Sequence, residues 1–140
     1  MLRVVLDANV YVSAAIRPEG PPGLVIGRFL RAGAFEVVLS PAIVAEVLRA
    51  LAYPKVQRLI RGDLDVTLWF EDVLVLADLI PDSANVAAVC SDPDDDKYVA
   101  AALEGRASLI VTGDRRLLDL GLYDEVLIVS PRALLDILDR

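Results

Sequence analysis

Short apolar runs rich in β-branched residues, alternating with helical patterns, restrict the fold of this 140-residue chain more than any other feature. Four such runs occupy residues 2–6, 35–39, 109–112 and 126–129. Runs without polar alternation are typical of strands buried on both faces, as in parallel sheets covered by helices. The pattern therefore predicts an α/β fold: one three-layer α/β/α domain over residues 1–140, with a mainly parallel central sheet.

Two of the runs end in Ser-Pro, at Ser40-Pro41 and Ser130-Pro131. This pair is typical of a helix start, because the Ser hydroxyl accepts a hydrogen bond from a free N–H of the first turn and Pro fits the first helical position. One apolar stripe follows each pair. Each is therefore predicted to begin a helix that packs one face on the sheet.

A further helix is predicted from Asp63, as its N-cap, toward Leu79. Its apolar residues cover most of its circumference. Packing in the core explains this pattern, and a contact between subunits is the alternative. The hydrophobic share of the chain, 56%, also favours an oligomer interface, since a small domain has much surface relative to its volume.

Composition excludes several catalytic chemistries. The chain has no His and one Cys, so it builds neither a Ser-His-Asp relay nor a structural zinc site. Its net charge is −7, with eight Lys or Arg against four acids in residues 1–61 and six against seventeen in residues 62–140. A general nucleic-acid binder usually has a basic field, so only a local basic rim is expected. Its candidates are Arg49, Lys55, Arg58 and Arg61, and solvated helix faces are the alternative.

The sequence also predicts where the protein works. Asp7 interrupts the first apolar run, so no signal-peptide core fits there, and no apolar run reaches the roughly 18 residues of a membrane span. One Cys forms no disulfide within the chain. We expect a soluble protein of a reducing compartment, the cytoplasm.

Acidic residues follow two of the predicted strands. Asp7 ends the first strand in Asp7-Ala8-Asn9, and Asp114 follows another in Thr112-Gly113-Asp114. Either Asp taken alone is explained as a helix cap. Two at the same edge of a parallel sheet indicate a site, because ligands bind outside the carboxyl ends of such strands.

The densest acidic run is Asp92-Pro93-Asp94-Asp95-Asp96-Lys97. Acids stabilise a helix N-terminus, which this run precedes, but capping needs only one or two of them. Four within five residues repel one another. A bound cation or a basic partner is therefore the alternative to a capping role.

Glu46 is a fourth acidic candidate. In the predicted helix it lies outside the apolar stripe and in line with Ala42 and Ala50, whose small side chains leave room for a ligand. A solvated surface position is the alternative. Carboxylates without His or Cys suit Mg²⁺ or Mn²⁺, which bind phosphates and activate water, so phosphoryl chemistry is predicted.

The ordered set of these motifs resembles the PIN-domain ribonucleases, and specifically the VapC-like toxin branch of toxin-antitoxin systems. The resemblance covers essentially the whole chain. It rests on Asp7-Ala8-Asn9, Ser40-Pro41 with Glu46, the run 92–98 with its following alanines, and Thr112-Gly113-Asp114 before Arg115, Arg116 and Leu117.

The resemblance implies a PIN-like fold and a metal-dependent RNA endonuclease. The implied catalytic and metal-binding acids are Asp7, Glu46, Asp95 and Asp114, with Asp92 and Asp96 as further ligand candidates in the acidic run. Asn9 and Thr112 match supporting polar positions. A homodimer and a cognate antitoxin are also implied, and single-stranded or looped RNA is the expected substrate.

Three alternatives stay open at this point. A haloacid-dehalogenase-type phosphatase also begins with a strand and Asp, but Asn9 stands where its second Asp is expected. A receiver domain needs a phosphate-accepting Asp on a central strand and a later Lys, which the sequence does not place. A non-catalytic interaction protein of the same fold is the third alternative.

Overall fold

The computed structural model describes residues 1–83, 90 and 92–140. Its sheet has the strand order β3-β2-β1-β4-β6-β5, and every neighbouring pair is parallel except β5 with β6. The strands are β1 (Arg3–Leu6), β2 (Glu36–Leu39), β3 (Asp78–Leu79), β4 (Leu109–Val111), β5 (Leu122–Tyr123) and β6 (Val126–Val129). The predicted mainly parallel sheet is confirmed.

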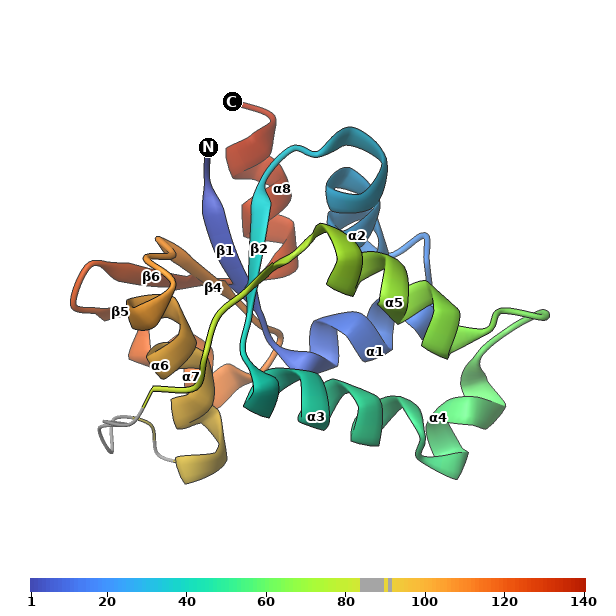
Figure 1. Cartoon of the computed structure of the whole chain (residues 1–140). Helices are drawn as coiled ribbons and strands as arrows, with labels where there is room; N and C mark the ends of the chain where they lie inside the picture. The colour runs from blue at the N-terminus through green and yellow to red at the C-terminus, as the bar shows by residue number, and fades with distance from the viewer. Residues whose placement is uncertain (84–89, 91) are drawn as a thin grey trace.

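Helices connect the strands and cover both faces of the sheet (Figure 1). Helix α6 packs against β1, β2, β4 and β6, whereas α2 packs between α1 and α8. The helices are α1 (Ala8–Ile16), α2 (Pro21–Ala32), α3 (Pro41–Leu51), α4 (Pro54–Leu59), α5 (Val66–Leu76), α6 (Asp96–Glu104), α7 (Arg115–Leu120) and α8 (Pro131–Leu138). A short 3-10 helix, η1 (Pro93–Asp95), precedes α6. The layers are those of the predicted α/β/α fold.

The central strands are buried on both faces. The side chains of Val4, Val5 and Leu6 in β1 are fully buried, as are Ile110 and Val111 in β4. Such positions demand apolar residues at every step, which explains why the sequence of these strands lacks polar alternation. The rigid centre of the sheet thus supports whatever follows the ends of β1 and β4.

Both predicted Ser-Pro helix starts are confirmed. The Ser40 hydroxyl accepts a hydrogen bond from the N–H of Ile43 at 3.4 Å, and Ser130 accepts one from Ala133 at 3.1 Å. In each case Pro is the first helical residue. The start of α3 receives a second bond, from the N–H of Ala42 to Asp82 at 3.1 Å.

The helix predicted from Asp63 toward Leu79 is wrong at both ends. Its N-cap is Asp65, whose carboxylate accepts bonds from two backbone N–H groups, and α5 ends at Leu76. Beyond it the chain pairs with β2 as strand β3. The Arg3 guanidinium bridges Glu36 at 2.9 Å and Asp78 at 2.7 Å, so three neighbouring strands share one cation.

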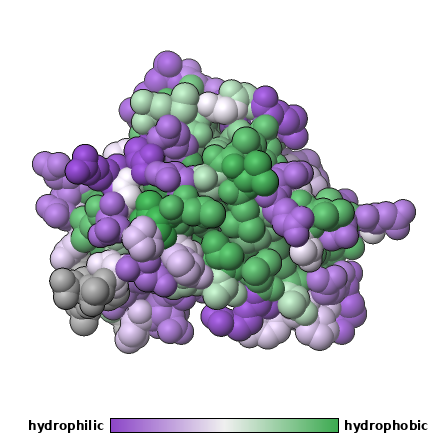
Figure 2. Space-filling view, viewed as in Figure 1, coloured by the Kyte–Doolittle hydropathy of each residue, from purple (hydrophilic) through white to green (hydrophobic). Residues whose placement is uncertain are grey.

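Helix α5 is only partly buried by the chain itself. Val66, Phe70 and Val73 face the core. By contrast, Leu68, Val75 and Leu76 are 59%, 81% and 57% exposed. Figure 2, which has the same view as Figure 1, shows hydrophobic side chains gathered in the middle of the visible face of the molecule. Within the described ranges, no helix combines the length and the apolar character that crossing a membrane requires.

Candidate active site

Asp7 and Asp114 lie at the carboxyl ends of adjacent strands, as predicted. Leu6 is paired with Val111, and the N–H of Asp7 continues the ladder with a 2.9 Å bond to the Val111 carbonyl. Asp7 is buried and caps α1 by accepting the N–H of Asn9 at 3.2 Å. Asp114 caps α7 by accepting the N–H of Arg116 at 2.9 Å. Both acids therefore cap a helix and also face the sheet edge.

The two supporting polar residues lie between these acids. The fully buried Thr112 donates its hydroxyl to Asp7 at 2.6 Å, and the same oxygen accepts the N–H of Asp114 at 2.9 Å. The Asn9 side chain accepts the N–H of Gly113 at 3.5 Å. Thr112 thus fixes the Asp7 carboxylate and the backbone before Asp114 through one oxygen atom.

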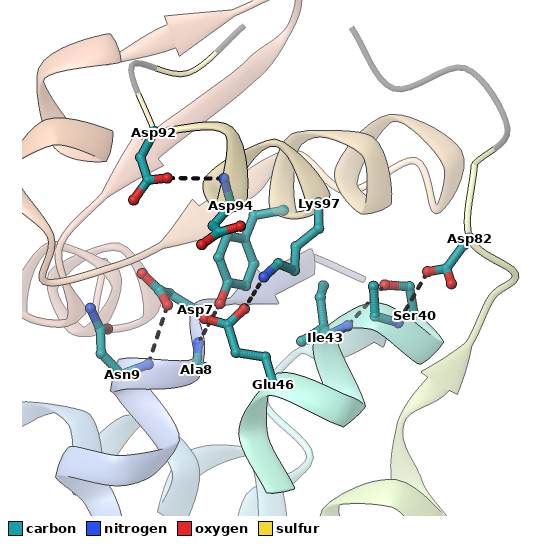
Figure 3. A network of polar contacts seen from close by, with 12 residues as sticks. Asp7, Ala8, Asn9, Ser40, Ile43, Glu46, Asp82, Asp92, Asp94 and Lys97 are labelled. Atoms are coloured by element: carbon teal, nitrogen blue, oxygen red, sulfur yellow. Dashed lines mark hydrogen bonds and ion pairs between the residues drawn. The ribbon is translucent and has the colours of Figure 1, made fainter. Parts of the chain in front are cut away.

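Glu46 reaches the site from α3, where it meets a cation that sequence reasoning did not single out. The Lys97 ammonium on α6 donates a hydrogen bond to the Glu46 carboxylate, and both side chains are half-buried. Figure 3 shows Glu46 lying between Lys97 and Asp7. This ion pair joins α3 and α6 through two residues that are 51 positions apart in the chain.

Tyr98 is a second residue that sequence reasoning left without a role at the site. Its fully buried hydroxyl accepts a 3.2 Å hydrogen bond from the N–H of Ala8, the residue directly after Asp7. Burial and the charges of Asp7 and Glu46 raise the pKa of Tyr98, so the hydroxyl stays protonated. The sequence signals only an apolar helix position here, because the contact joins residues 90 positions apart.

The four aspartates of the acidic run have different environments. Asp92 caps η1 by accepting the N–H of Asp94 at 3.0 Å, while the Asp94 side chain itself is exposed. Asp96 is buried and accepts the N–H of Cys90 at 2.7 Å. Asp95 differs from all three: its Oδ2 atom is buried and, among the described residues, has no hydrogen-bond partner.

Burial and neighbouring charge oppose ionisation of two acids in the site. Burial, together with the charges of Asp114, Asp7 and Asp92, raises the pKa of Asp95 to about 6. Burial also raises the pKa of Asp7, although its hydrogen bonds from Thr112 and Asn9 act in the opposite direction. Both shifts express the cost of gathering negative charge where water is partly excluded.

A cavity of about 350 Å³ brings the predicted acids together. Its carboxylates are those of Asp7, Glu46, Asp92, Asp94, Asp95 and Asp114. The whole expected quartet lines it, together with Asp92 and Asp94, whereas Asp96 does not. Within residues 1–83, 90 and 92–140, no three carboxylates converge closely enough to form a ready-made metal site. Glu46 is bound to Lys97 instead, and Asp7 to Thr112.

The donor set nevertheless fits a hard divalent cation. All of these ligand candidates offer oxygen, as Mg²⁺ and Mn²⁺ prefer. The buried Asp95 oxygen, which has no partner among the residues that the structure describes, is the most direct sign of a site for positive charge, because buried carboxylate oxygens are otherwise paired. A cation there would offset the repulsion that raises the pKa of Asp95.

The four residues expected to form a basic rim are not among the residues that line the cavity. Arg49 belongs to α3, Lys55 and Arg58 belong to α4, and Arg61 follows. All four are exposed, and Arg61 is paired with Glu19 at 2.7 Å. Sequence reasoning gave no role to a nearer cation, Arg116, which lies 3.5 Å from Asp92 and 3.8 Å from Asp114.

Comparison with known proteins gives the same assignment as the sequence motifs. The family model of the PIN domain matches residues 3–116, which include all four quartet acids. The chain belongs to the PIN-domain family. This membership confirms the predicted resemblance and supports a nuclease, since PIN domains are generally nucleases. Because the chain belongs to this family, it is neither a haloacid-dehalogenase-type phosphatase nor a receiver domain.

The chain is similar to one protein in sequence and to two solved structures in fold. The uncharacterized protein MJ1680 of Methanocaldococcus jannaschii is 32% identical over 122 residues, covering 85% of this chain and 75% of the relative. The crystal structure of PAE2754 from Pyrobaculum aerophilum has a TM-score of 0.60 at 18% identity, covering 99% of this chain and 90% of the other. VapBC2 from Rickettsia felis, bound to a DNA fragment from their promoter, has a TM-score of 0.61 at 14% identity, with coverage of 92% and 98%. These two structures support the fold.

Proposed function

We propose that this PIN domain is a metal-dependent endoribonuclease, the toxin component of a toxin-antitoxin system. Three findings support the proposal: the family membership, the similarity of fold to VapBC2, and the cavity lined by the acidic quartet. The single observation that carries it is the Asp95 carboxylate: the residue lines that cavity, and its buried Oδ2 atom has no hydrogen-bond partner among the described residues.

The proposed ligands of Mg²⁺ or Mn²⁺ are Asp7 and Asp95, with Glu46 and Asp114 acting directly or through water. Asp92 is a further candidate, since it lines the same cavity. Such an ion, when bound, neutralises phosphate oxygens and makes water a better nucleophile near neutral pH. No side chain then needs to act as a strong base.

The chain's own residues prepare this chemistry. The Thr112 hydroxyl orients Asp7 and favours its charged form, as hydrogen bonds to metal-binding side chains generally do. Lys97 holds Glu46 beside the site and balances its charge. Ala8 and Val12 line the cavity on the α1 side.

The proposed substrate is single-stranded or looped RNA. Proteins read RNA sequence mainly in such segments, because a duplex hides its base edges in a deep, narrow groove. Arg49 of α3, Lys55 and Arg58 of α4, and Arg61 just after α4 are exposed and are the proposed phosphate contacts. A rim of this kind offsets the acidic net charge of the chain, which otherwise repels RNA.

Two protein partners belong to the proposal. A second copy is proposed to cover the exposed side chains of Leu68, Val75 and Leu76 on α5, together with Leu79 of β3, forming a homodimer. Sedimentation velocity measures this directly: Val75→Asp should shift the protein toward a monomer, while Leu122→Asp on the far edge of the sheet should not. A cognate antitoxin is proposed to cover the acidic cavity, and the reaction is assigned to the cytoplasm.

The function is tested by incubating the purified protein with mixed RNA in EDTA, Mg²⁺ or Mn²⁺. Cleavage should appear with metal and vanish with EDTA. Asp95→Asn should raise the metal concentration for half-maximal cleavage and lower the rate at saturating metal. Asp94→Asn is the matched control, since this neighbour lines the same cavity but its side chain is exposed.

Four results would contradict the proposal or a part of it. Cleavage that persists in EDTA would show that the reaction does not depend on a metal ion. Equal cleavage rates and metal requirements of the Asp94 and Asp95 variants would indicate that the acidic run only caps a helix. Turnover of phosphomonoesters without RNA cleavage would indicate a phosphatase instead. If Asp92→Asn or Asp96→Asn impairs metal-dependent cleavage more than Asp95→Asn does, the metal ligand is that other aspartate of the run.

A further inference from the structure

The cavity that holds the carboxylates has a second end of different chemistry. There it is lined by Val12 of α1, Ala50 of α3, and Tyr53 and Val56 at the start of α4. Three of these side chains are aliphatic and one is aromatic. One continuous cavity therefore offers a negatively charged wall and an apolar wall to the same ligand.

Tyr53 is unusual among the aromatic residues of the chain. The chain has eight of them, all within the described ranges, and the other seven are buried or partly buried. Tyr53 is 59% exposed. An aromatic ring left in water forgoes a large hydrophobic gain, so its place at a cavity rather than in the core indicates a contact surface.

The backbone around Tyr53 is braced. The residue follows α3 and precedes Pro54, which restricts its backbone to the extended conformation that it adopts, with φ −60° and ψ 132°. Gln57 secures the turn twice, since its N–H bonds the Tyr53 carbonyl at 3.0 Å and its side chain bonds the Leu51 carbonyl at 2.6 Å. The ring therefore projects from a fixed support.

The lining of the cavity runs from the acidic wall to this ring along α3. Glu46 and Ala50 are four residues apart on α3, the spacing that places side chains on one helix face, and Tyr53 follows just beyond the end of that helix. Ala50 lies between the other two, and its methyl group leaves the cavity open there. A ligand that contacts Glu46 at one end can thus reach Tyr53 at the other.

A nucleotide has the same two kinds of surface, a charged phosphate and a flat base with apolar faces. We infer that the Tyr53 end of the cavity is a base subsite, in which the ring stacks on an unpaired nucleobase adjoining the scissile phosphate. This inference rests on the proposed ribonuclease function. Stacking on an aromatic side chain requires a base whose face is free, so the subsite selects single-stranded or looped RNA at the cut.

The experiment compares Tyr53→Ala with Tyr53→Phe on a defined substrate. One cut site is first mapped in a mixed RNA, and oligonucleotides are made with either base beside it removed. The parent protein should show a KM higher by roughly five- to a hundredfold on one abasic oligonucleotide, with kcat near its original value. Tyr53→Ala should raise KM on the intact oligonucleotide by a similar factor, and removal of the base should then raise the KM of this variant little further. Tyr53→Phe should match the parent.

The control variant is Leu59→Ala, which removes a 50% exposed side chain from the same helix, outside the cavity. Its KM should equal that of the parent, and thermal melts of all variants should coincide. If the parent cuts RNA but neither base removal nor Tyr53→Ala changes KM, the base subsite is overturned while the ribonuclease function stands. If the parent cuts no RNA with either metal, both proposals fail.

Discussion

The Thr112 hydroxyl donates a 2.6 Å hydrogen bond to the Asp7 carboxylate from an adjacent strand end, and both side chains are buried. The same oxygen accepts the N–H of Asp114 at 2.9 Å. One hydroxyl therefore sets the position of one quartet acid and of the backbone that carries another. Its loss should affect the site more than the fold.

Thr112→Val keeps the shape of the side chain and removes this hydroxyl. We expect metal-dependent RNA cleavage, or the affinity for Mg²⁺, to fall by about 10- to 100-fold, the usual effect of losing a partner of a metal-binding side chain. Thr112→Ser should retain most of the activity. Thr67→Val, on the exposed surface of α5, is the control. Parental cleavage by Thr112→Val would show that the hydroxyl has no part in the site.

Lys97 should limit the affinity of the metal-free site for cations. Lys97→Met leaves Glu46 half-buried without its counterion, so the free energy of unfolding without metal should fall by about 1–2 kcal/mol, between the values for surface and buried pairs. Mg²⁺ should then bind more tightly and raise Tm further than in the parent. Lys55→Met, on exposed α4, should change neither quantity. An equal Mg²⁺ shift in parent and Lys97→Met would refute this role.

The raised pKa of Asp95, about 6, predicts how stability depends on pH. Between about pH 4 and pH 6, the folded metal-free protein keeps a proton on Asp95 that the unfolded chain has released. Unfolding therefore releases a proton, and the free energy of unfolding should fall as pH rises through this range. The raised pKa of Asp7 acts in the same direction.

Urea unfolding in EDTA at several pH values measures this effect. Asp95→Asn should be more stable than the parent above about pH 6, and the difference should shrink toward pH 4. Asp94→Asn serves as the control. Protons and metal compete for Asp95, so the half-saturating Mg²⁺ concentration should rise as pH falls below about 6. If the free energies of unfolding of the parent and Asp95→Asn differ by the same amount at every pH, the prediction is wrong.

The basic rim predicts a change in salt dependence. Replacing Arg49, Lys55 or Arg58 by Gln should weaken RNA binding and flatten the plot of log affinity against log salt, by about 0.7 for each phosphate that is no longer neutralised. Arg61→Gln should have a smaller effect, because Arg61 is already paired with Glu19. Fluorescence anisotropy with a labelled oligonucleotide provides the slopes. Unchanged slopes for all four variants would place the RNA on another surface.

Local signals were sufficient to predict most elements of the fold. The run before Asp7 and the two Ser-Pro pairs carry their own structural chemistry, namely full burial and helix capping. Strand β3 has no such signal: Asp78 and Leu79 are both exposed, and they form a strand only because the edge of β2 offers hydrogen bonds. This pairing also explains why the predicted helix stops early, at Leu76.

The candidate site shows the same division. Asp7 and Asp114 were predictable because parallel strands bring their carboxyl ends to one edge. Lys97 and Tyr98 were not, because their partners, Glu46 and Ala8, lie 51 and 90 positions away. The different environments of Asp94 and Asp95 also arise from tertiary structure, since these neighbours in η1 differ in burial: Asp94 is exposed, whereas one Asp95 oxygen is buried.

Capping gives Asp7, Asp92 and Asp114 a value to the fold that is independent of catalysis, since each accepts a backbone N–H at a helix start. Glu46 and Asp95 have no capping hydrogen bond of this kind. A descendant that kept the fold but abandoned cleavage would therefore retain the capping acids under selection for stability alone. Glu46 and Asp95 would drift first. Among sequences related to this one, these two positions are thus the better markers of an active enzyme.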